Sequence, residues 1–179
     1  MLGFMSQLKP YRMQCYVSGL PDAARVNQAL GAAYARLRDD PDLQRTHFFA
    51  GRYENVYVPE ARMPVLQPVL AEARRAAGAY LQQPGVELSM GFWINEMGPG
   101  HVTLPHCHDE DGELVSGVYY IRVPENSGEL VLTLGDLLTR VTPVEGQFVF
   151  FPPDMVHEVT ENRSTDTRLS IGMNFGIRQ

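Results

Sequence analysis

The periodicity of apolar residues changes near residue 85, and this change limits the folds that the chain can adopt. From residue 86 every second position is apolar for five steps: Val86, Leu88, Met90, Phe92 and Ile94. A period of two is typical of β-strands, whose successive side chains point to opposite faces. Similar runs follow, separated by Gly, Pro and Asn, at 114–123, 129–134, 147–151 and 168–177. Many short strands without an amphipathic helix between them predict a closed barrel or a two-sheet jelly roll.

The residues before 86 have helical periodicity instead. One segment follows a candidate N-cap at Asp22, and its apolar stripe is Val26, Leu30, Ala33 and Leu37. The stripe of the second segment is Leu66, Leu70, Ala73, Ala77 and Tyr80. Pro68 fits this second helix only in its first turn, because an interior proline loses a backbone hydrogen bond and clashes with the preceding turn. Residues 47–59, rich in aromatic and β-branched residues, form either a strand or an extended loop.

These patterns predict a mainly β (α+β) protein in which the N-terminal helices brace one outer face of a sheet. We expect a single domain over 1–179, with a helical N-terminal cover at 1–85 and a barrel core at 86–179. The 179 residues are 44% apolar and 20% charged, which is ordinary for a globular protein and excludes a disordered chain.

Charge and cysteine content limit the partners and the compartment. The net charge is −6 and no Lys or Arg cluster occurs, so nucleic acid and anionic membrane are not expected partners. Cys15 and Cys107 are too few for a disulfide framework, which favours a reducing compartment. The start does not resemble a signal peptide, and no apolar run approaches the ~18 residues of a membrane span. We therefore expect a cytoplasmic protein; whether it is a homo-oligomer is left open.

Three of the five histidines have a spacing that suits a metal site. On a strand, His106 and His108 point to one side and Cys107 to the other, and His157 can come from an adjacent strand. Neutral imidazoles suit iron, zinc, copper or nickel. The simpler alternative is that these histidines lie in a solvated polar loop, and His47 and His101 are expected to be ordinary polar residues.

An oxygen-activating iron site usually adds a carboxylate to two histidines. The nearest candidates are Glu110, two residues past His108, and Glu113.

A second candidate pair is Arg168 and Ser170, which share one face of the last strand. An arginine that points into a barrel needs an anion, and its planar fork matches a carboxylate with two parallel hydrogen bonds. The serine hydroxyl can add a third bond. The alternative is that this face is simply the solvent side of the strand.

Together these motifs resemble the iron(II)- and 2-oxoglutarate-dependent oxygenases, especially a small bacterial and phage branch of that superfamily. The motifs that carry the resemblance are Trp93-Ile94-Asn95, His106-Cys107-His108, Ser116-Gly117-Val118-Tyr119-Tyr120, Phe151-Pro152 before His157, and Arg168-Leu169-Ser170-Ile171. Each motif alone is weak, but the five in this order are fairly specific over residues 86–179.

The resemblance implies a double-stranded β-helix that binds Fe(II) and 2-oxoglutarate. His106 matches the first metal ligand and His157 the distal one, while Arg168 and Ser170 match the pair that holds the far carboxylate of 2-oxoglutarate. Tyr120 and Asn95 are candidate catalytic-site residues that hydrogen-bond the co-substrate.

The sequence departs from the superfamily at the acidic ligand, since His108 stands where Asp or Glu is usual. Either His108 is the third ligand, or the pair is shifted to His108 and Glu110 and His106 lies outside the ligand set. We favour the first.

The implied activity is oxidation of a small organic or amino-acid-like substrate by O₂, with 2-oxoglutarate decarboxylated to succinate. Loops 47–59 and 97–104 are expected to set specificity. One alternative is a cupin-type dioxygenase or isomerase, which would bind metal through His106, His108, Glu113 and His157 without 2-oxoglutarate. The other alternative is a barrel that binds metal or ligand without turnover.

Overall fold

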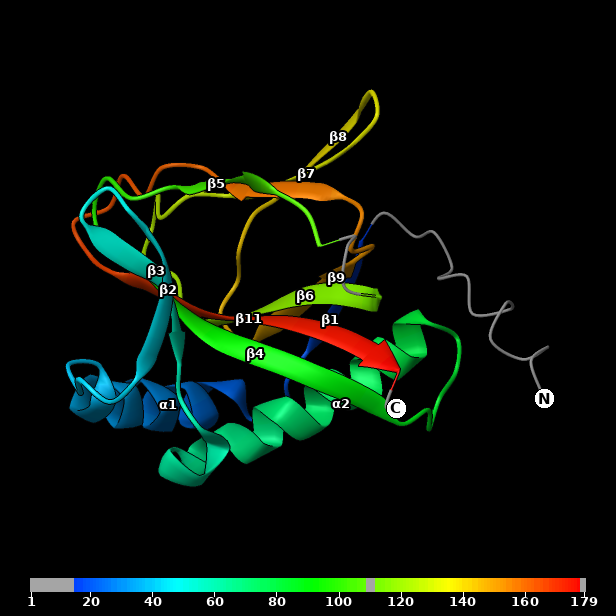
Figure 1. Cartoon of the computed structure of the whole chain (residues 1–179), viewed down its shortest axis with the longest axis horizontal. Helices are drawn as coiled ribbons and strands as arrows, with labels where there is room; N and C mark the ends of the chain where they lie inside the picture. Colours follow the sequence, from blue (N-terminus) through cyan, green and yellow to red (C-terminus); the bar gives the residue numbers. More distant parts are fainter. Residues whose placement is uncertain (1–14, 109–111, 178–179) are drawn as a thin grey trace.

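The computed structural model describes residues 15–108 and 112–177, and in them two antiparallel sheets face each other with two α-helices outside the larger sheet (Figure 1). The helical elements are α1 (Ala23–Leu37), the short 3₁₀ turns η2 (Glu60–Arg62) and η3 (Pro64–Leu66), and α2 (Gln67–Tyr80). The seven strands of the larger sheet are, in spatial order, β1 (Tyr16–Gly19), β9 (Gln147–Phe151), β6 (Glu113–Arg122), β11 (Arg168–Ile177), β4 (Leu88–Met97), β3 (Arg52–Tyr57) and β2 (Gln44–Phe49). The four strands of the smaller sheet are, in order, β5 (Thr103–His106), β10 (Val156–Val159), β7 (Leu130–Leu134) and β8 (Leu137–Val141). The mainly β class is confirmed.

The alternating pattern of β11 separates a helix-packed core from a cavity. Leu169, Ile171, Met173 and Phe175 are at most 1% exposed and pack in one core with residues of both helices. The intervening residues, from Arg168 to Gly176, line the space between the sheets. Burial of the apolar face fixes the strand register, because a slip of one residue would turn the apolar set away from the core.

The two predicted helices form close to the expected positions. α2 has Pro68 in its first turn, where the missing N–H costs nothing, and its stripe from Leu66 to Tyr80 is at most 1% exposed. Asp22 occupies the N-cap position of α1, but its backbone is left-handed (φ 57°) and its side chain makes no capping bond. The Asp22 carboxylate accepts a hydrogen bond from Arg25 instead.

Residues before 86 also supply strands to both edges of the larger sheet. The segment that was either strand or loop forms a hairpin, in which β2 pairs with β3 and β3 pairs with β4 through Asn55 and Asn95. At the other edge β1 pairs with β9. The β2–β3 hairpin therefore extends the larger sheet at one edge (Figure 1). Residues of this hairpin also line the cavity.

Candidate metal and anion site

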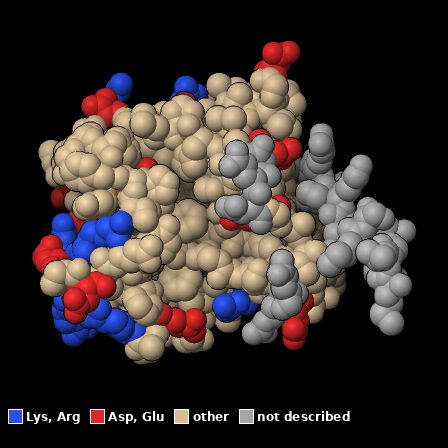
Figure 2. All heavy atoms as spheres, in the orientation of Figure 1, with Lys and Arg blue, Asp and Glu red and all other residues tan. Residues whose placement is uncertain are grey.

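A cavity of about 1410 Å³ lies between the two sheets and brings the sequence-predicted residues together. Its walls include every predicted site residue that the structure describes: Asn95, His106, His108, Tyr120, His157, Arg168 and Ser170. Figure 2 shows that charged side chains on this face lie mostly near its edges. Glu110, the alternative metal ligand, lies outside the described residues. Glu113 lines the cavity, but it is not part of the histidine group described next.

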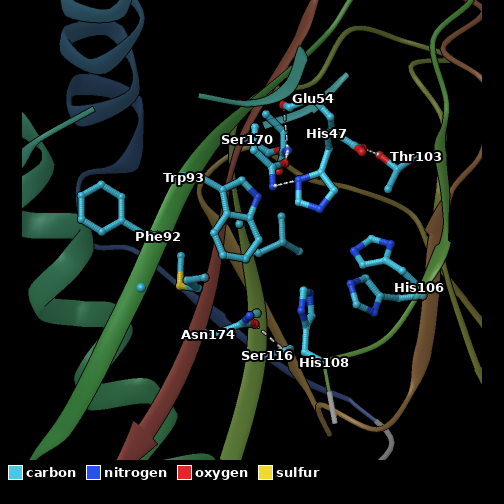
Figure 3. A pocket seen from close by; sticks show the side chains of 18 of the residues that line it. His47, Glu54, Phe92, Trp93, Thr103, His106, His108, Ser116, Ser170 and Asn174 are labelled. Carbon is cyan, nitrogen blue, oxygen red and sulfur yellow. Dashed lines mark hydrogen bonds between the residues drawn. The ribbon is translucent and has the colours of Figure 1, made fainter. Parts of the chain in front are cut away.

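His106, His108 and His157 form a compact group that could hold a metal ion. One ring nitrogen from each lies within 4.8 Å of the others. His106 and His157 are directly opposite each other on the paired strands β5 and β10, with ring centroids 4.1 Å apart. The His108 ring lies 5.1 and 5.2 Å from the other two (Figure 3).

Strand alternation is not what aims His108 at the group, so that part of our interpretation is wrong. β5 ends at His106, and His108 lies beyond the strand. Its backbone N–H donates to the carbonyl of Pro153 at 2.8 Å, which ties the segment to the loop before β10. The ring of Trp93 lies 6.1 Å from the His108 ring. Tertiary contacts therefore position this third imidazole.

Backbone carbonyls set the tautomers of the other two histidines. Nδ1 of His106 lies 2.8 Å from the carbonyl oxygen of Leu104, and Nδ1 of His157 lies 3.1 Å from that of Met155. A carbonyl can only accept, so each Nδ1 carries the proton and each Nε2 keeps its lone pair. Burial, together with His106 and His108, lowers the pKa of His157 to about 3. A neutral imidazole is the form that binds a metal.

The lowered pKa of His157 predicts a pH-dependent stability for the metal-free protein. The unfolded chain protonates this histidine near its ordinary pKa of 6.5, whereas the folded chain does so only near 3. The free energy of unfolding should therefore fall as the pH decreases through this window, by up to ~1.4 kcal/mol per pH unit. Urea unfolding of the wild type and of His157→Gln between pH 7 and 4 measures the difference in slope. Equal slopes would contradict the prediction.

Arg168 is a buried cation without a carboxylate partner in the described part of the chain. It is 1% exposed, and one guanidinium nitrogen donates to the carbonyls of Gly128 at 2.9 Å and Ser127 at 3.3 Å. Its guanidinium carbon lies 5.1 Å from the centre of the Tyr120 ring. Because Arg168 and Ser170 are both buried against the cavity, the solvent-facing alternative is wrong.

Two buried polar atoms, Nε of Arg168 and the hydroxyl of Tyr120, form no hydrogen bond of good geometry within the described residues, although the two side chains interact with each other. Burial raises the pKa of Tyr120 to about 12, so the hydroxyl keeps its proton and can donate. Buried donors without acceptors are costly. An anion at this position would satisfy both, and a carboxylate matches the arginine fork.

Asn95 is held by the neighbouring hairpin. It lies opposite Ser170 in the register of β4 and β11. Its amide nitrogen donates to Oδ1 of Asn55 at 2.9 Å and to the carbonyl of Glu54 at 3.1 Å. Both amide hydrogens are thereby used, and only the amide oxygen remains for a ligand.

The sequence interpretation missed several cavity residues. His47, expected to be an ordinary polar residue, lines the cavity with Glu54 and Thr103, and its ring points inward in Figure 3. The aromatic, β-branched character of residues 47–59 indicated a strand but not which sheet it joins. His101 does behave as an ordinary polar residue, since its Nδ1 accepts from the backbone N–H of Gly98 at 2.9 Å within a turn.

Trp93 packs over Gly172 on the adjacent strand, and this contact requires glycine. A Cβ at residue 172 would lie 2.6 Å from the indole, whereas one at Gly91 would meet nothing within 4 Å. We expect Gly172→Ala to displace Trp93 and to cost about 1–3 kcal/mol of unfolding free energy. Thermal denaturation and Trp93 fluorescence measure the effect, and Gly91→Ala is the matched control. Equal effects of the two substitutions would contradict the prediction.

A model of the 2OG-Fe(II) oxygenase superfamily matches residues 92–176, from β4 to β11. This part of the chain, residues 92–176, belongs to the superfamily. The superfamily uses Fe(II) and 2-oxoglutarate, so this chain is a 2-oxoglutarate-dependent oxygenase that takes O₂ and a small-molecule substrate. The described helices are not long and apolar enough for any of them to cross a bilayer.

Solved structures agree with this oxygenase fold. A prolyl-4-hydroxylase from Pseudomonas putida is 25% identical, with a TM-score of 0.68 over 93% of this chain and 94% of that one. The epimerase SnoN from nogalamycin biosynthesis, in complex with Fe³⁺ and α-ketoglutarate, is 19% identical, with a TM-score of 0.67 over 93% and 80%. A viral collagen prolyl hydroxylase from Paramecium Bursaria Chlorella virus-1 is 14% identical, with a TM-score of 0.66 over 100% and 99%. A search of curated proteins finds no match. The double-stranded β-helix is confirmed.

Proposed function

We propose that this oxygenase oxidises a small organic or amino-acid-like substrate at a metal held by His106, His108 and His157. Arg168 would bind the far carboxylate of 2-oxoglutarate, which is decarboxylated to succinate. The observation that carries the proposal is a buried guanidinium without a carboxylate partner, on the same cavity as three clustered imidazoles. When bound, iron and 2-oxoglutarate supply the oxidising chemistry.

The chain's own residues would orient these groups and limit the access of water. The carbonyls of Leu104 and Met155 fix the ring orientation of His106 and His157, which favours metal affinity. Ser170, beside Arg168, would add a hydroxyl donor to the same carboxylate. Tyr120, whose buried hydroxyl has no acceptor among the described residues, would donate there as well. Asn95 would contribute through its amide oxygen.

Three neutral histidines leave the metal's charge undiminished, whereas the usual carboxylate ligand would remove one unit. We infer that this site depends more strongly on the anionic co-substrate for charge balance. A metal held by His106, His108 and His157 therefore favours 2-oxoglutarate as its co-substrate over a reaction without it. The cupin alternative gives Arg168 no role.

The test is turnover of 2-oxoglutarate by the iron-reconstituted protein with ascorbate, measured as succinate. The proposal expects succinate formation that needs both iron and 2-oxoglutarate. Anaerobic titration of the iron(II) protein with 2-oxoglutarate gives a second readout without turnover. A fully iron-loaded protein that binds no 2-oxoglutarate would contradict the proposal. The cytoplasmic location remains a prediction. So does the single domain with an N-terminal cover at 1–85 and a barrel core at 86–179. A homo-oligomer is left open.

A further inference from the structure

A second buried charged residue lies in the cavity wall. It is on the β2–β3 hairpin, which supplies none of the residues proposed to bind the metal or 2-oxoglutarate. Glu54 of β3 is 7% exposed and lines the cavity. The hydroxyl of Thr103, on β5, donates to one oxygen of its carboxylate (Figure 3). The two sheets therefore meet at this acid, on the cavity surface.

No cation of the described residues forms an ion pair with Glu54. Arg52, on the same strand, donates to the carbonyls of Glu96 at 3.3 Å and Val102 at 2.8 Å and stacks on Phe49. Arg168 is held by the carbonyls of Ser127 and Gly128. Arg52 interacts electrostatically with Glu54 but forms no ion pair with it. A carboxylate taken out of water without a directly paired cation is costly, so this wall favours a ligand that brings one.

His47 adds a hydrogen-bond donor to the same wall. The amide of Asn95 donates to Oδ1 of Asn55, and Nδ2 of Asn55 donates to Nδ1 of His47 at 3.1 Å. Nδ1 of His47 also lies 2.8 Å from the hydroxyl of Thr46, which can donate to it as well. Because the amide nitrogen of Asn55 can only donate, Nδ1 accepts, and the proton of a neutral His47 ring is on Nε2, which can donate into the cavity. The backbone of His47 has φ 58°, a strained conformation for a residue with a side chain. Such strain is concentrated at functional sites.

We propose that Glu54 and Thr103, with His47 beside them, bind a cationic nitrogen on the small-molecule substrate. An ammonium or guanidinium group would pair with the Glu54 carboxylate, and His47 would donate to a neighbouring oxygen of the same molecule. The substrate class is then an amine- or guanidine-bearing, amino-acid-like compound. This inference rests on the proposed function, since it places that substrate in the same cavity as the metal and Arg168.

Trp93 provides a direct measurement of binding. It is the only tryptophan of the chain and it lines the cavity. We would titrate the anaerobic iron(II)–2-oxoglutarate protein at pH 7 with n-butylamine, with n-butanol as the neutral probe and butyrate as the anionic one. We expect the change in Trp93 fluorescence to saturate at a lower concentration of butylamine than of butanol or butyrate.

Glu54→Gln keeps the size of the side chain and an acceptor for Thr103, but removes the charge. It should weaken butylamine binding by about tenfold or more, as expected for loss of a charge-assisted contact, and leave butanol unchanged. Glu87→Gln is the matched control, because Glu87 is exposed and does not line the cavity. That variant should bind butylamine as the wild type does.

The two proposals fail in different ways. Unchanged butylamine binding in Glu54→Gln, or an equal loss in Glu87→Gln, would overturn the inference, provided that the variants bind iron and 2-oxoglutarate normally and melt at the wild-type temperature. Equal binding of butylamine and butanol by the wild type would overturn it as well. If the iron-loaded wild-type protein does not bind 2-oxoglutarate, the proposed function is contradicted instead.

Discussion

His157→Ala is expected to abolish stoichiometric iron binding. It removes one of three proposed protein ligands, the one that is most buried and whose Nδ1 is already fixed by the carbonyl of Met155. Water can occupy the position but replaces an oriented imidazole poorly. Metal analysis after anaerobic reconstitution and desalting measures the effect. Near-full iron content in the variant would remove His157 from the ligand set.

The same assay distinguishes the two possible ligand sets. If His106, His108 and His157 hold the metal, His106→Ala should lose iron and Glu110→Gln should keep it. If the ligand pair is shifted to His108 and Glu110, the two results are exchanged. The close approach of the His106 and His157 rings, 4.1 Å between centroids, favours the first outcome.

Arg168→Ala is expected to weaken 2-oxoglutarate binding by about 10- to 100-fold. The substitution removes a charge-assisted contact in a buried position, and such contacts contribute roughly 1.5–3 kcal/mol. Iron content should stay unchanged, because Arg168 is not a ligand. Titration of the anaerobic iron(II) protein with 2-oxoglutarate, followed by its visible charge-transfer band, measures the affinity.

Arg168→Lys is the conservative control. An ammonium restores the charge but not the two parallel hydrogen bonds, so it should recover only part of the affinity. An enzyme of the cupin type would show no dependence on 2-oxoglutarate before the substitution. Wild-type affinity in an iron-loaded Arg168→Ala protein would show that Arg168 does not bind the carboxylate.

The sequence by itself determined the strands whose two faces differ strongly. Residues 168–177 are β11 as predicted, because one face is apolar and the register has one favourable setting. The same alternation placed Arg168 and Ser170 on one face. Residues 147–151 are β9 as predicted, although the apolar residues of this strand are buried on both faces. The apolar stripe of α2 and the place of Pro68 in its first turn were also predictable from the sequence. Both depend only on neighbouring residues: the stripe on the 3.6-residue period of a helix, and Pro68 on the backbone hydrogen bond that a proline cannot form.

The tertiary structure decided what each face meets. Periodicity does not distinguish a strand face in solvent from one in a cavity. It therefore could not predict that Arg168 is buried or that Glu54 lines the cavity, because both depend on how the two sheets face each other. The convergence of His108 depends on a backbone bond to Pro153, 45 residues away, and not on strand geometry. Contacts between segments distant in sequence leave little local signal, because the partner, and not the segment, sets the geometry.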